Sequence, residues 1–231
     1  MTRRAQRDAT VFAHALADIP VPVTVVEAQT TSAFSLDYDG EQRTMRVDAV
    51  GDPWSTTVLD GAGIDTAWVH LAALLRGEFP AEAIAHLDAA GHRISLDGQG
   101  LVRLARPGPM RVDDEYDPDI LARLSVLKLA DDEATVLAGG EFTEATALAL
   151  GVPEILVTFG SAGADLYVDG ARAHVNAPRR VTGVHTTGSG DMFAVSYAAA
   201  RAAGAEPIDA ARAACELVAE VLERRLADQR G

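Results

Sequence analysis

A chain of 231 residues can bury one substantial core. Its hydrophobic (48%) and charged (23%) fractions are ordinary for a globular protein, which excludes a wholly disordered or collagen-like polymer. The net charge of −14 argues against a general nucleic-acid or anionic-membrane binder, because the summed field repels phosphate, so an anionic ligand would have to be held by local backbone dipoles.

The cysteine content and the start of the chain indicate the compartment. The single cysteine, Cys215, excludes an intrachain disulfide and a cysteine-based zinc site, and it favours the reducing cytoplasm. No uncharged apolar run approaches the ~18–20 residues of a membrane span. The apolar stretch Val11–Ile19 is interrupted by His14 and Asp18, which is untypical of a signal peptide. We therefore expect an intracellular protein without a membrane partner.

The first third of the chain alternates with a period of two, as half-exposed strands do. Val23–Glu27 is a β-branched run, and Ala33–Tyr38 alternates before Asp39-Gly40, a strong hairpin turn signal. Thr44–Val50 reads as the returning strand. Polar residues on one face predict a small β lid at residues 21–50, and its edges would suit a homodimer contact.

From Thr66 onward, continuous apolar strands alternate with helical segments. This order implies right-handed βαβ crossovers and a mainly parallel sheet covered on both faces, hence a three-layer α/β/α sandwich in one domain of residues 1–231. A hairpin with Asp169-Gly170 as its turn extends the sheet. The expected strands are 67–74 (or the start of a helix), 93–96, 126–129 and 155–159, and the expected helices are 80–90, 118–124, 131–137, 144–150, 191–203 and 207–226.

The segment 184–193 carries the chemical information. Two glycines flank a small residue directly before a helix, and such a nest of amides can hold an anion without basic side chains. The amides of Gly188, Ser189 and Gly190 would stabilise charge on a transferring phosphoryl group, while Asp191 accepts a proton from a substrate hydroxyl. The alternative is that Asp191 is an ordinary helix cap and the glycines only form a tight turn.

Two other phosphate-binding motifs are excluded. A dinucleotide fingerprint would need glycine where Phe193 stands, which disfavours a nicotinamide-dependent enzyme. A P-loop needs a Gly-Lys pair, and the only lysine, Lys128, follows Leu127.

Several segments resemble the ribokinase-like (PfkB) carbohydrate kinases. Thr186-Thr-Gly-Ser-Gly-Asp-Met-Phe193 resembles their C-terminal signature, Asp-Thr-Thr-Gly-Ala-Gly-Asp-x-Phe. Val157–Gly163 looks like the family's Thr-x-Gly-x-x-Gly turn along the nucleotide phosphates, and Leu127–Ala134 looks like its Lys-Pro-Asn-x-x-Glu segment. Residues 31–34 with 39–44 look like the strands that cover the sugar. The resemblance spans about residue 21 to the end.

The resemblance implies a ribokinase-like fold and ATP-dependent phosphorylation of a hydroxyl on a sugar, a nucleoside or a polyol, including an inositol-like one. Its cofactors would be ATP and Mg²⁺, with a monovalent cation as a further option. Asp191 would be the general base, the amides at 188–190 the anion hole, and Glu133 would organise magnesium-bound water. The residues on the nucleotide side would be Thr158, Gly160, Gly163, Lys128 and Thr187, and those on the acceptor side Asp97, Phe34 and Asp191.

The chain departs from the family pattern in three places. His185 stands where the signature has its first Asp, and Ala130 stands where the magnesium-associated segment has Asn. The family also begins with a strand and a Gly-Gly segment that line the substrate pocket, whereas residues 1–20 resemble only the tail of that region. We therefore expect a complete nucleotide half and an incomplete acceptor half. The alternative function is a non-catalytic nucleotide-binding or interaction protein that retains the kinase fold.

Some polar residues have a simpler structural interpretation. Asp97 ends a strand, where parallel sheets place ligand groups, but an Asp before Gly98 also forms turns. Asp131 and Asp132 suit the first turn of a helix. His70 shows no metal-site spacing and is expected to be a scaffold residue.

Overall fold

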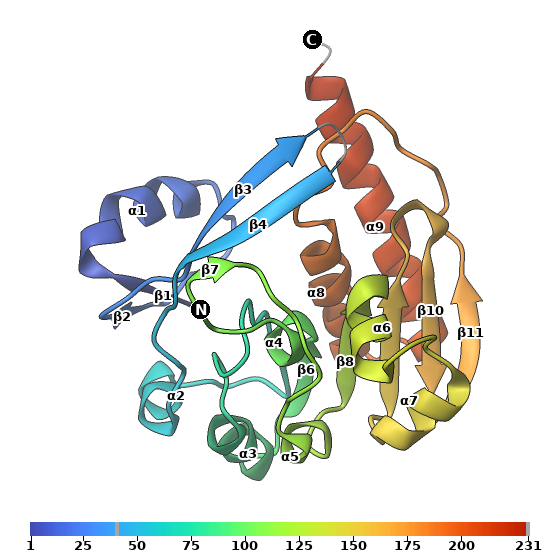
Figure 1. Cartoon of the computed structure of the whole chain (residues 1–231), viewed down its shortest axis with the longest axis horizontal. Helices are drawn as coiled ribbons and strands as arrows, with labels where there is room; N and C mark the ends of the chain where they lie inside the picture. The colour runs from blue at the N-terminus through green and yellow to red at the C-terminus, as the bar shows by residue number, and fades with distance from the viewer. Residues whose placement is uncertain (40–41, 230–231) are drawn as a thin grey trace.

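A six-stranded sheet with the order β11-β10-β9-β8-β6-β5 forms the centre of the computed structural model, which describes residues 1–39 and 42–229 (Figure 1). The four strands from β9 to β5 are parallel, and β10 and β11 continue the sheet antiparallel. The strands are β5 (Trp68–Leu71), β6 (Arg93–Asp97), β8 (Val126–Ala130), β9 (Glu154–Thr158), β10 (Ala164–Val168) and β11 (Ala171–Val175).

Helices cover both faces of this sheet, which explains why its strands read as apolar runs. Successive side chains of a strand point to opposite faces. Leu156 accordingly packs with Phe193 of α8, while its neighbours Ile155 and Val157 pack in the other cluster with Ile84 of α3. The expected three-layer α/β/α sandwich is confirmed. The helices are α8 (Ser189–Ala202) and α9 (Pro207–Asp228) on one face, and α3 (Ala81–Ala89), α6 (Asp131–Ala138) and α7 (Glu144–Leu150) on the other.

Helix α8 is fixed to the sheet by a buried polar network. The Tyr197 hydroxyl donates to Glu154 Oε2 at 2.6 Å, and Arg201 binds the same carboxylate with N–O distances of 2.6 to 3.1 Å. Burial, together with the hydrogen bond to Glu154, raises the pKa of Tyr197 far above its ordinary range. The network holds α8 against β9.

The first strand and helix were not expected from the sequence. Strand β1 (Thr2–Ala5) pairs in parallel with β2 (Val25–Ala28) in a two-stranded sheet, and α1 (Ala9–Ala17) connects them after the 3-10 turn η1 (Gln6–Asp8). No helix among residues 1–39 and 42–229 is long and apolar enough to cross a membrane.

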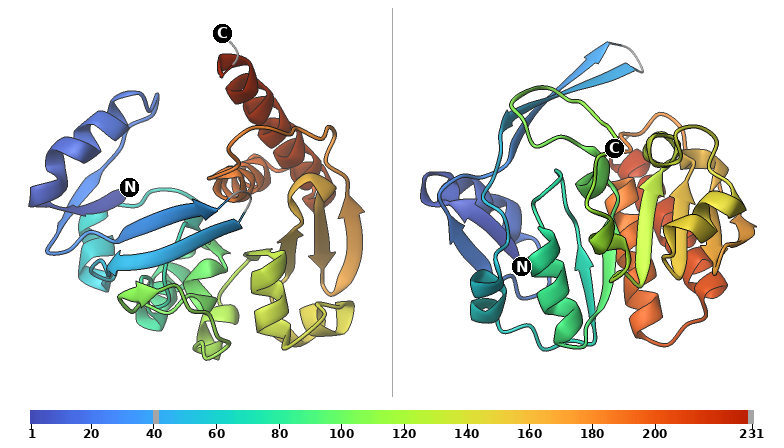
Figure 2. Two further views of the ribbon diagram at one scale, coloured as in Figure 1. Left: turned by 45° about the horizontal axis from the view of Figure 1, so that its top comes forward. Right: turned by 60° about the horizontal axis from the view of Figure 1, so that its bottom comes forward.

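A hairpin projects from the side of the molecule where β8 and β9 end (Figures 1 and 2). Strands β3 (Ala33–Asp39) and β4 (Gln42–Ala49) pair antiparallel, and β7 (Gly108–Pro109) adds a third strand. Gly40 of the expected turn lies outside the described residues. The other turn is confirmed, since Asp169 and Gly170 take positive φ of 47° and 85°, as hairpin turns of the primed types require. The short helices are α2 (Thr56–Ala62), α4 (Gln99–Val102), α5 (Pro118–Leu121) and η2 (Gly160–Ala162).

Candidate active site

Two neighbouring parallel strands end in a buried ion pair. Asp97 on β6 stands opposite Lys128 on β8 in the strand register, and Lys128 Nζ lies 3.5 Å from Asp97 Oδ2. The side chain of Asp97 is fully buried and that of Lys128 is 6% exposed. Burial raises the pKa of Asp97 from 3.8 to about 6, against the opposing effect of the Lys128 charge. A charged pair is thus held where parallel sheets place ligand groups.

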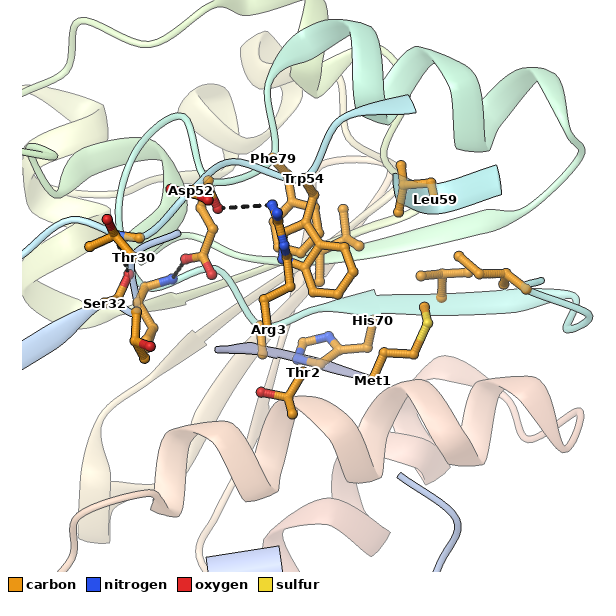
Figure 3. Close-up of a pocket in the computed structure, with 18 of the residues that line it drawn as sticks. Met1, Thr2, Arg3, Thr30, Ser32, Asp52, Trp54, Leu59, His70 and Phe79 are labelled. Carbon is orange, nitrogen blue, oxygen red and sulfur yellow. Dashed lines mark hydrogen bonds between the residues drawn. The ribbon is translucent and has the colours of Figure 1, made fainter. Parts of the chain in front are cut away.

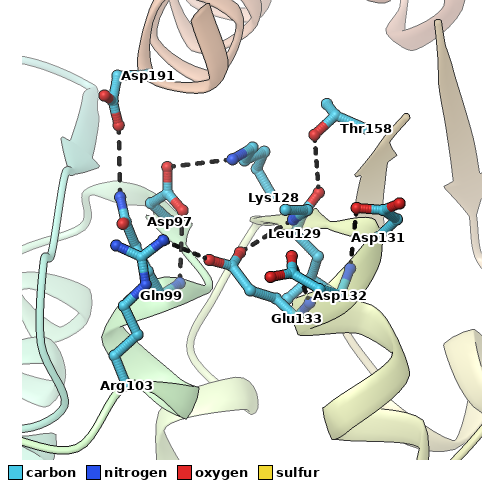
Figure 4. Close-up of polar contacts among 11 residues, drawn as sticks. Asp97, Gln99, Arg103, Lys128, Leu129, Asp131, Asp132, Glu133, Thr158 and Asp191 are labelled. Atoms are coloured by element: carbon cyan, nitrogen blue, oxygen red, sulfur yellow. Dashed lines mark hydrogen bonds and ion pairs between the residues drawn. The ribbon is translucent and has the colours of Figure 1, made fainter. Parts of the chain in front are cut away.

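The first turn of α8 lies directly over this pair (Figure 4). A Cβ added to Gly190 would lie 2.9 Å from Lys128 Nζ, so the absence of a side chain lets the ammonium approach the helix N-terminus. Asp191, one residue further, accepts a 3.4 Å hydrogen bond from Gln99 Nε2. Two strand ends and one helix start therefore contribute acidic and basic groups to one site.

The glycine-rich loop places backbone amides at this point. Gly188 caps α8 with φ of 83°, a left-handed conformation that glycine adopts at no steric cost. The Ser189 amide donates to the Thr186 carbonyl at 3.0 Å within the loop, and its part in the anion hole stays a prediction. No hydrogen bond within the described residues uses the amides of Gly188, Gly190 or Asp191. These three can serve an anion.

The long C-terminal helix α9 is hydrogen-bonded to the same loop. Arg225 of α9 donates to the carbonyls of His185 and Thr187 at 3.4 and 3.1 Å. The positions that precede the glycines are thus connected to the scaffold through their backbone.

Glu133 is also buried in the site, but both of its oxygens are engaged. Oε2 accepts from the Ala130 amide at 2.9 Å, and Oε1 accepts from Arg103 Nη2 at 3.2 Å. Asp131 and Asp132 accept hydrogen bonds from the amides that directly follow them, which agrees with their helix-start interpretation. Within residues 1–39 and 42–229, no group of three or more His, Cys, Asp or Glu side chains could hold a metal ion.

The turn after β9 adjoins the site on its other side. Thr158 stands opposite Ala130 in the register, and its hydroxyl donates to the Leu129 carbonyl at 3.2 Å. Gly160 and Gly163 have positive φ of 54° and 102°. A Cβ on Gly163 would lie 2.1 Å from the Val175 carbonyl oxygen, so the fold itself demands glycine there.

One expected residue of the acceptor side comes from the hairpin. Phe34 lies on β3 opposite Val47 in the register, and its role toward the acceptor stays a prediction. Conversely, Gln99 belongs to the site although the sequence did not indicate it. His70, expected to be scaffold, binds Ser95 Oγ through Nδ1 at 3.1 Å. Burial lowers its pKa to about 4, against the opposing effect of the nearby Asp191 carboxylate.

Comparisons with known proteins agree with this geometry. Residues 60–229 match the family described as pfkB family carbohydrate kinase. The chain is 30% identical over 145 residues to the inositol 3-kinase of Zea mays, a match that covers 61% of this chain and 36% of that protein. The chain thus spans little more than a third of the length of this curated relative.

Solved structures show the same fold. A pyrophosphate-dependent kinase in the ribokinase family, complexed with a pyrophosphate analog and myo-inositol, superimposes with a TM-score of 0.81 at 23% identity, over 96% of this chain and 79% of that chain. The ribokinase of Arabidopsis thaliana, complexed with ribose and ATP, superimposes with a TM-score of 0.72 at 20% identity, over 96% of this chain and 75% of that chain. The expected ribokinase-like fold is confirmed.

Proposed function

Because this chain belongs to the pfkB family of carbohydrate kinases, we propose that it transfers a phosphoryl group from ATP to a hydroxyl of a small polyol. The observation that carries the proposal is the position of Lys128, whose ammonium lies beneath Gly190 and beside the free amides of the α8 start. A cation beside amides that have no partner among the described residues suits a phosphoryl group in transfer. Asp191 follows Gly190 directly.

The acceptor is an inositol-like polyol in this proposal. The relative from Zea mays is an inositol 3-kinase, and one structure with the same fold contains myo-inositol. Sugars and nucleosides are the other acceptors that the reaction class allows. That structure also contains a pyrophosphate analog, so pyrophosphate is a second donor to be compared with ATP.

Each residue of the site has a defined part in the transfer. A carboxylate oxygen of Asp191 takes the proton of the acceptor hydroxyl, whose oxygen attacks the terminal phosphorus of the donor while the bond to the bridging oxygen breaks. The amides of Gly188 and Gly190 and the ammonium of Lys128 hold the phosphoryl oxygens as their charge shifts. Asp97 keeps the ammonium in place, and Gln99 orients the Asp191 carboxylate.

Mg²⁺ would enter with the donor. It usually keeps several waters and binds through substrate phosphates with one or two carboxylates. The site fits this mode, since each oxygen of the buried Glu133 carboxylate accepts one hydrogen bond, from Ala130 or from Arg103, and keeps a second lone pair for a water. When bound, the ion neutralises the donor phosphates. Glu133 would act on water in the ion's shell, and Thr158 and Gly160 would border the donor.

The proposal extends to location and assembly. The single cysteine, Cys215, cannot form an intrachain disulfide, which suits a reducing compartment, and we place the enzyme in the cytoplasm. Strand β3 has one unpaired edge within the described sheet and carries Leu36, which is 41% exposed. Pairing of two hairpins in a homodimer would cover this edge.

The experiment compares donors and acceptors in a matrix. Mg²⁺ with ATP or with pyrophosphate is incubated with myo-inositol, ribose and a nucleoside, and ³¹P NMR detects a new phosphate monoester. We expect product with myo-inositol. Binding of ATP by calorimetry without product from any pair would establish the alternative, a non-catalytic nucleotide-binding protein, and the absence of both would refute the proposal.

A further inference from the structure

The edge strand β11 contacts the turn after β9 at two neighbouring positions. A Cβ on Gly163 would meet the Val175 carbonyl, so the backbones of the turn and of β11 lie close together. One residue earlier on β11, the His174 ring reaches the last residue of η2, where its Nε2 lies 3.1 Å from the Ala162 carbonyl oxygen. The conformation of the turn is therefore connected to the position of this ring.

The other ring nitrogen of His174 binds a buried carboxylate. Asp165 on β10 stands opposite His174 in the antiparallel register, and its Oδ1 lies 2.7 Å from His174 Nδ1. The Asp165 side chain is only 3% exposed, and its second oxygen, Oδ2, pairs with Arg172 Nη2 at 2.8 Å. A buried carboxylate is costly unless it is paired, and an adjacent guanidinium favours its ionised form. Asp165 therefore accepts from both partners and has no proton to donate.

Both nitrogens of the His174 ring thus face acceptors. A carbonyl oxygen and an ionised carboxylate can only accept, so each ring nitrogen must carry a hydrogen for both bonds to form. A neutral imidazole carries a hydrogen on one nitrogen only, whereas an imidazolium carries one on each. The two contacts of His174 are therefore those of an imidazolium. Because the side chain is 39% exposed, a neutral ring can instead turn one nitrogen toward water.

The charges around the His174 ring favour a positive ring. On the helical side, the Glu144 carboxylate at the start of α7 accepts a 2.9 Å hydrogen bond from the Arg172 amide. Burial raises the pKa of the Tyr167 hydroxyl, so this group stays neutral. The titratable and charged groups of this cluster are Asp165, Tyr167, Arg172, Glu141 and Glu144, which makes three carboxylates against one guanidinium. A second cation therefore suits the cluster.

We propose that His174 is a positioning residue, whose imidazolium holds the turn Gly160–Ala162 against β11 and thereby keeps the donor side of the site in its binding conformation. The step from the turn to the donor rests on the proposed function, in which Gly160 borders the donor. When the ring loses one proton, the bond to the charged Asp165 is the stronger one and is kept. The bond to the Ala162 carbonyl is then lost, so the donor should bind more weakly as the pH rises.

The first test observes the ring of His174 itself, without a donor. Proton–nitrogen NMR spectra of the histidine rings are recorded between about pH 5 and 8, the range in which histidine side chains change charge. We expect two protonated nitrogens on His174 at the acid end. The amide signals of Ala162 and Gly163 should shift with the same midpoint as the ring. A ring with a single proton throughout, or turn signals that do not follow the ring, would overturn the proposal.

His70 is the internal reference for this titration. It lies on β5, at the opposite edge of the six-stranded sheet, where it lines the pocket drawn in Figure 3. Its Nδ1 lies 3.1 Å from the Ser95 hydroxyl, which can donate or accept, so a neutral ring is satisfied there. Burial lowers the pKa of His70 to about 4, so its ring should stay neutral across the whole range.

Two matched substitutions separate the two ring nitrogens. The side-chain amide nitrogen of glutamine stands where Nε2 of histidine stands, and that of asparagine where Nδ1 stands. His174→Gln therefore keeps a donor for the Ala162 carbonyl at every pH, whereas His174→Asn keeps a donor for Asp165 alone.

The second test measures the affinity of these proteins for ATP with Mg²⁺ by calorimetry at pH 6 and 8. The affinity of the wild type relative to His174→Gln should fall about threefold to tenfold between the two pH values, the effect of one hydrogen bond. His174→Asn should bind ATP weakly at both. Protonation of ATP itself affects the three proteins equally and leaves these ratios unchanged.

The outcomes separate this inference from the proposed function. An equal pH dependence in the wild type and His174→Gln would refute the positioning role. Absence of ATP binding in all three proteins would refute the proposed function instead, while the NMR titration still decides whether the imidazolium of His174 holds the turn.

Discussion

Lys128 Nζ lies 3.5 Å from Asp97 Oδ2, and this oxygen accepts no hydrogen bond within the described residues. The distance is that of an ion pair without a well-formed hydrogen bond. The ammonium is therefore held between a carboxylate below it and the first turn of α8 above it, where Gly190 leaves room. Such a cation can turn toward an incoming phosphate without losing its counter-charge.

Asp191→Asn should reduce kcat by about 10² to 10⁴-fold, because the amide keeps the shape of the side chain and cannot accept the hydroxyl proton. Affinity for the donor, measured by calorimetry, should change little. A variant that retains most of the wild-type rate in the ³¹P assay would show that Asp191 only caps α8.

Gly190→Ala should weaken the use of the donor while leaving the stability of the fold nearly unchanged. The added Cβ would lie 2.9 Å from Lys128 Nζ, so the ammonium must move and the KM for the donor should rise by about tenfold or more. The free energy of unfolding should change by less than about 1 kcal/mol, since alanine favours the helix.

Gly61→Ala is the matched control for this variant. It lies in α2 with nothing within 4 Å of the added Cβ, and it should leave the kinetics unchanged. A common loss of activity in both variants would contradict our assignment of the α8 start.

The rate should fall on the acid side as Asp97 takes up a proton. Burial raises the pKa of this carboxyl to about 6, so kcat/KM should decrease as the pH falls through about 6, when Lys128 loses its counter-charge. Asp97→Asn should have a lower rate without this acid limb. An acid limb of the same midpoint in Asp97→Asn would assign it to another group.

The raised pKa of Asp97 also makes the stability of the fold depend on pH. Stability should fall as the pH rises, whereas the rate should rise. Because the pKa of Asp97 in the folded state lies above the ordinary value of 3.8, its contribution favours the folded state below pH 3.8 and is lost as the pH rises through about 6. Urea unfolding of wild type and Asp97→Asn between pH 4 and 7 measures the difference. The free energies of unfolding of the two proteins, plotted against pH, should diverge across this range. A constant difference between them would contradict a raised pKa of Asp97 in the folded protein.

Gly163→Ala should destabilise the fold more than Gly139→Ala. Both glycines have positive φ, which costs alanine about 1 kcal/mol. Only at Gly163 would the Cβ also meet the backbone, 2.1 Å from the Val175 oxygen, so we expect a further loss of at least about 2 kcal/mol in urea unfolding. Equal losses in the two variants would show that the turn after β9 can adjust.

Much of the sheet could be predicted because buried parallel strands are apolar throughout, as Ile155–Val157 is. Strand β1 was missed because Thr2–Ala5 contains two arginines and no apolar alternation, and it is held as a strand by its pairing with β2. Helix α2, Thr56–Ala62, was missed because seven residues with an internal glycine give too short a pattern.

The sequence indicated the candidate residues of the site one by one, and their roles stay predictions. It did not indicate which of them meet: the Asp97–Lys128 pair depends on β6 lying beside β8, which spacing does not reveal. The contact between Gln99 and Asp191 joins residues 92 positions apart. The place of Gly163 beside the nucleotide stays a prediction, and the structure adds that a side chain at this position would meet the Val175 carbonyl.

The chain contains one lysine, and its side chain is only 6% exposed. In this sequence an acylating reagent therefore finds one side-chain amine, the sheltered ε-amine of Lys128, besides the α-amino group of the chain. Mass spectrometry after limited acylation would thus measure how accessible Lys128 is, without an introduced label. A bound phosphate compound would lower the acylation of the single peptide that contains Lys128.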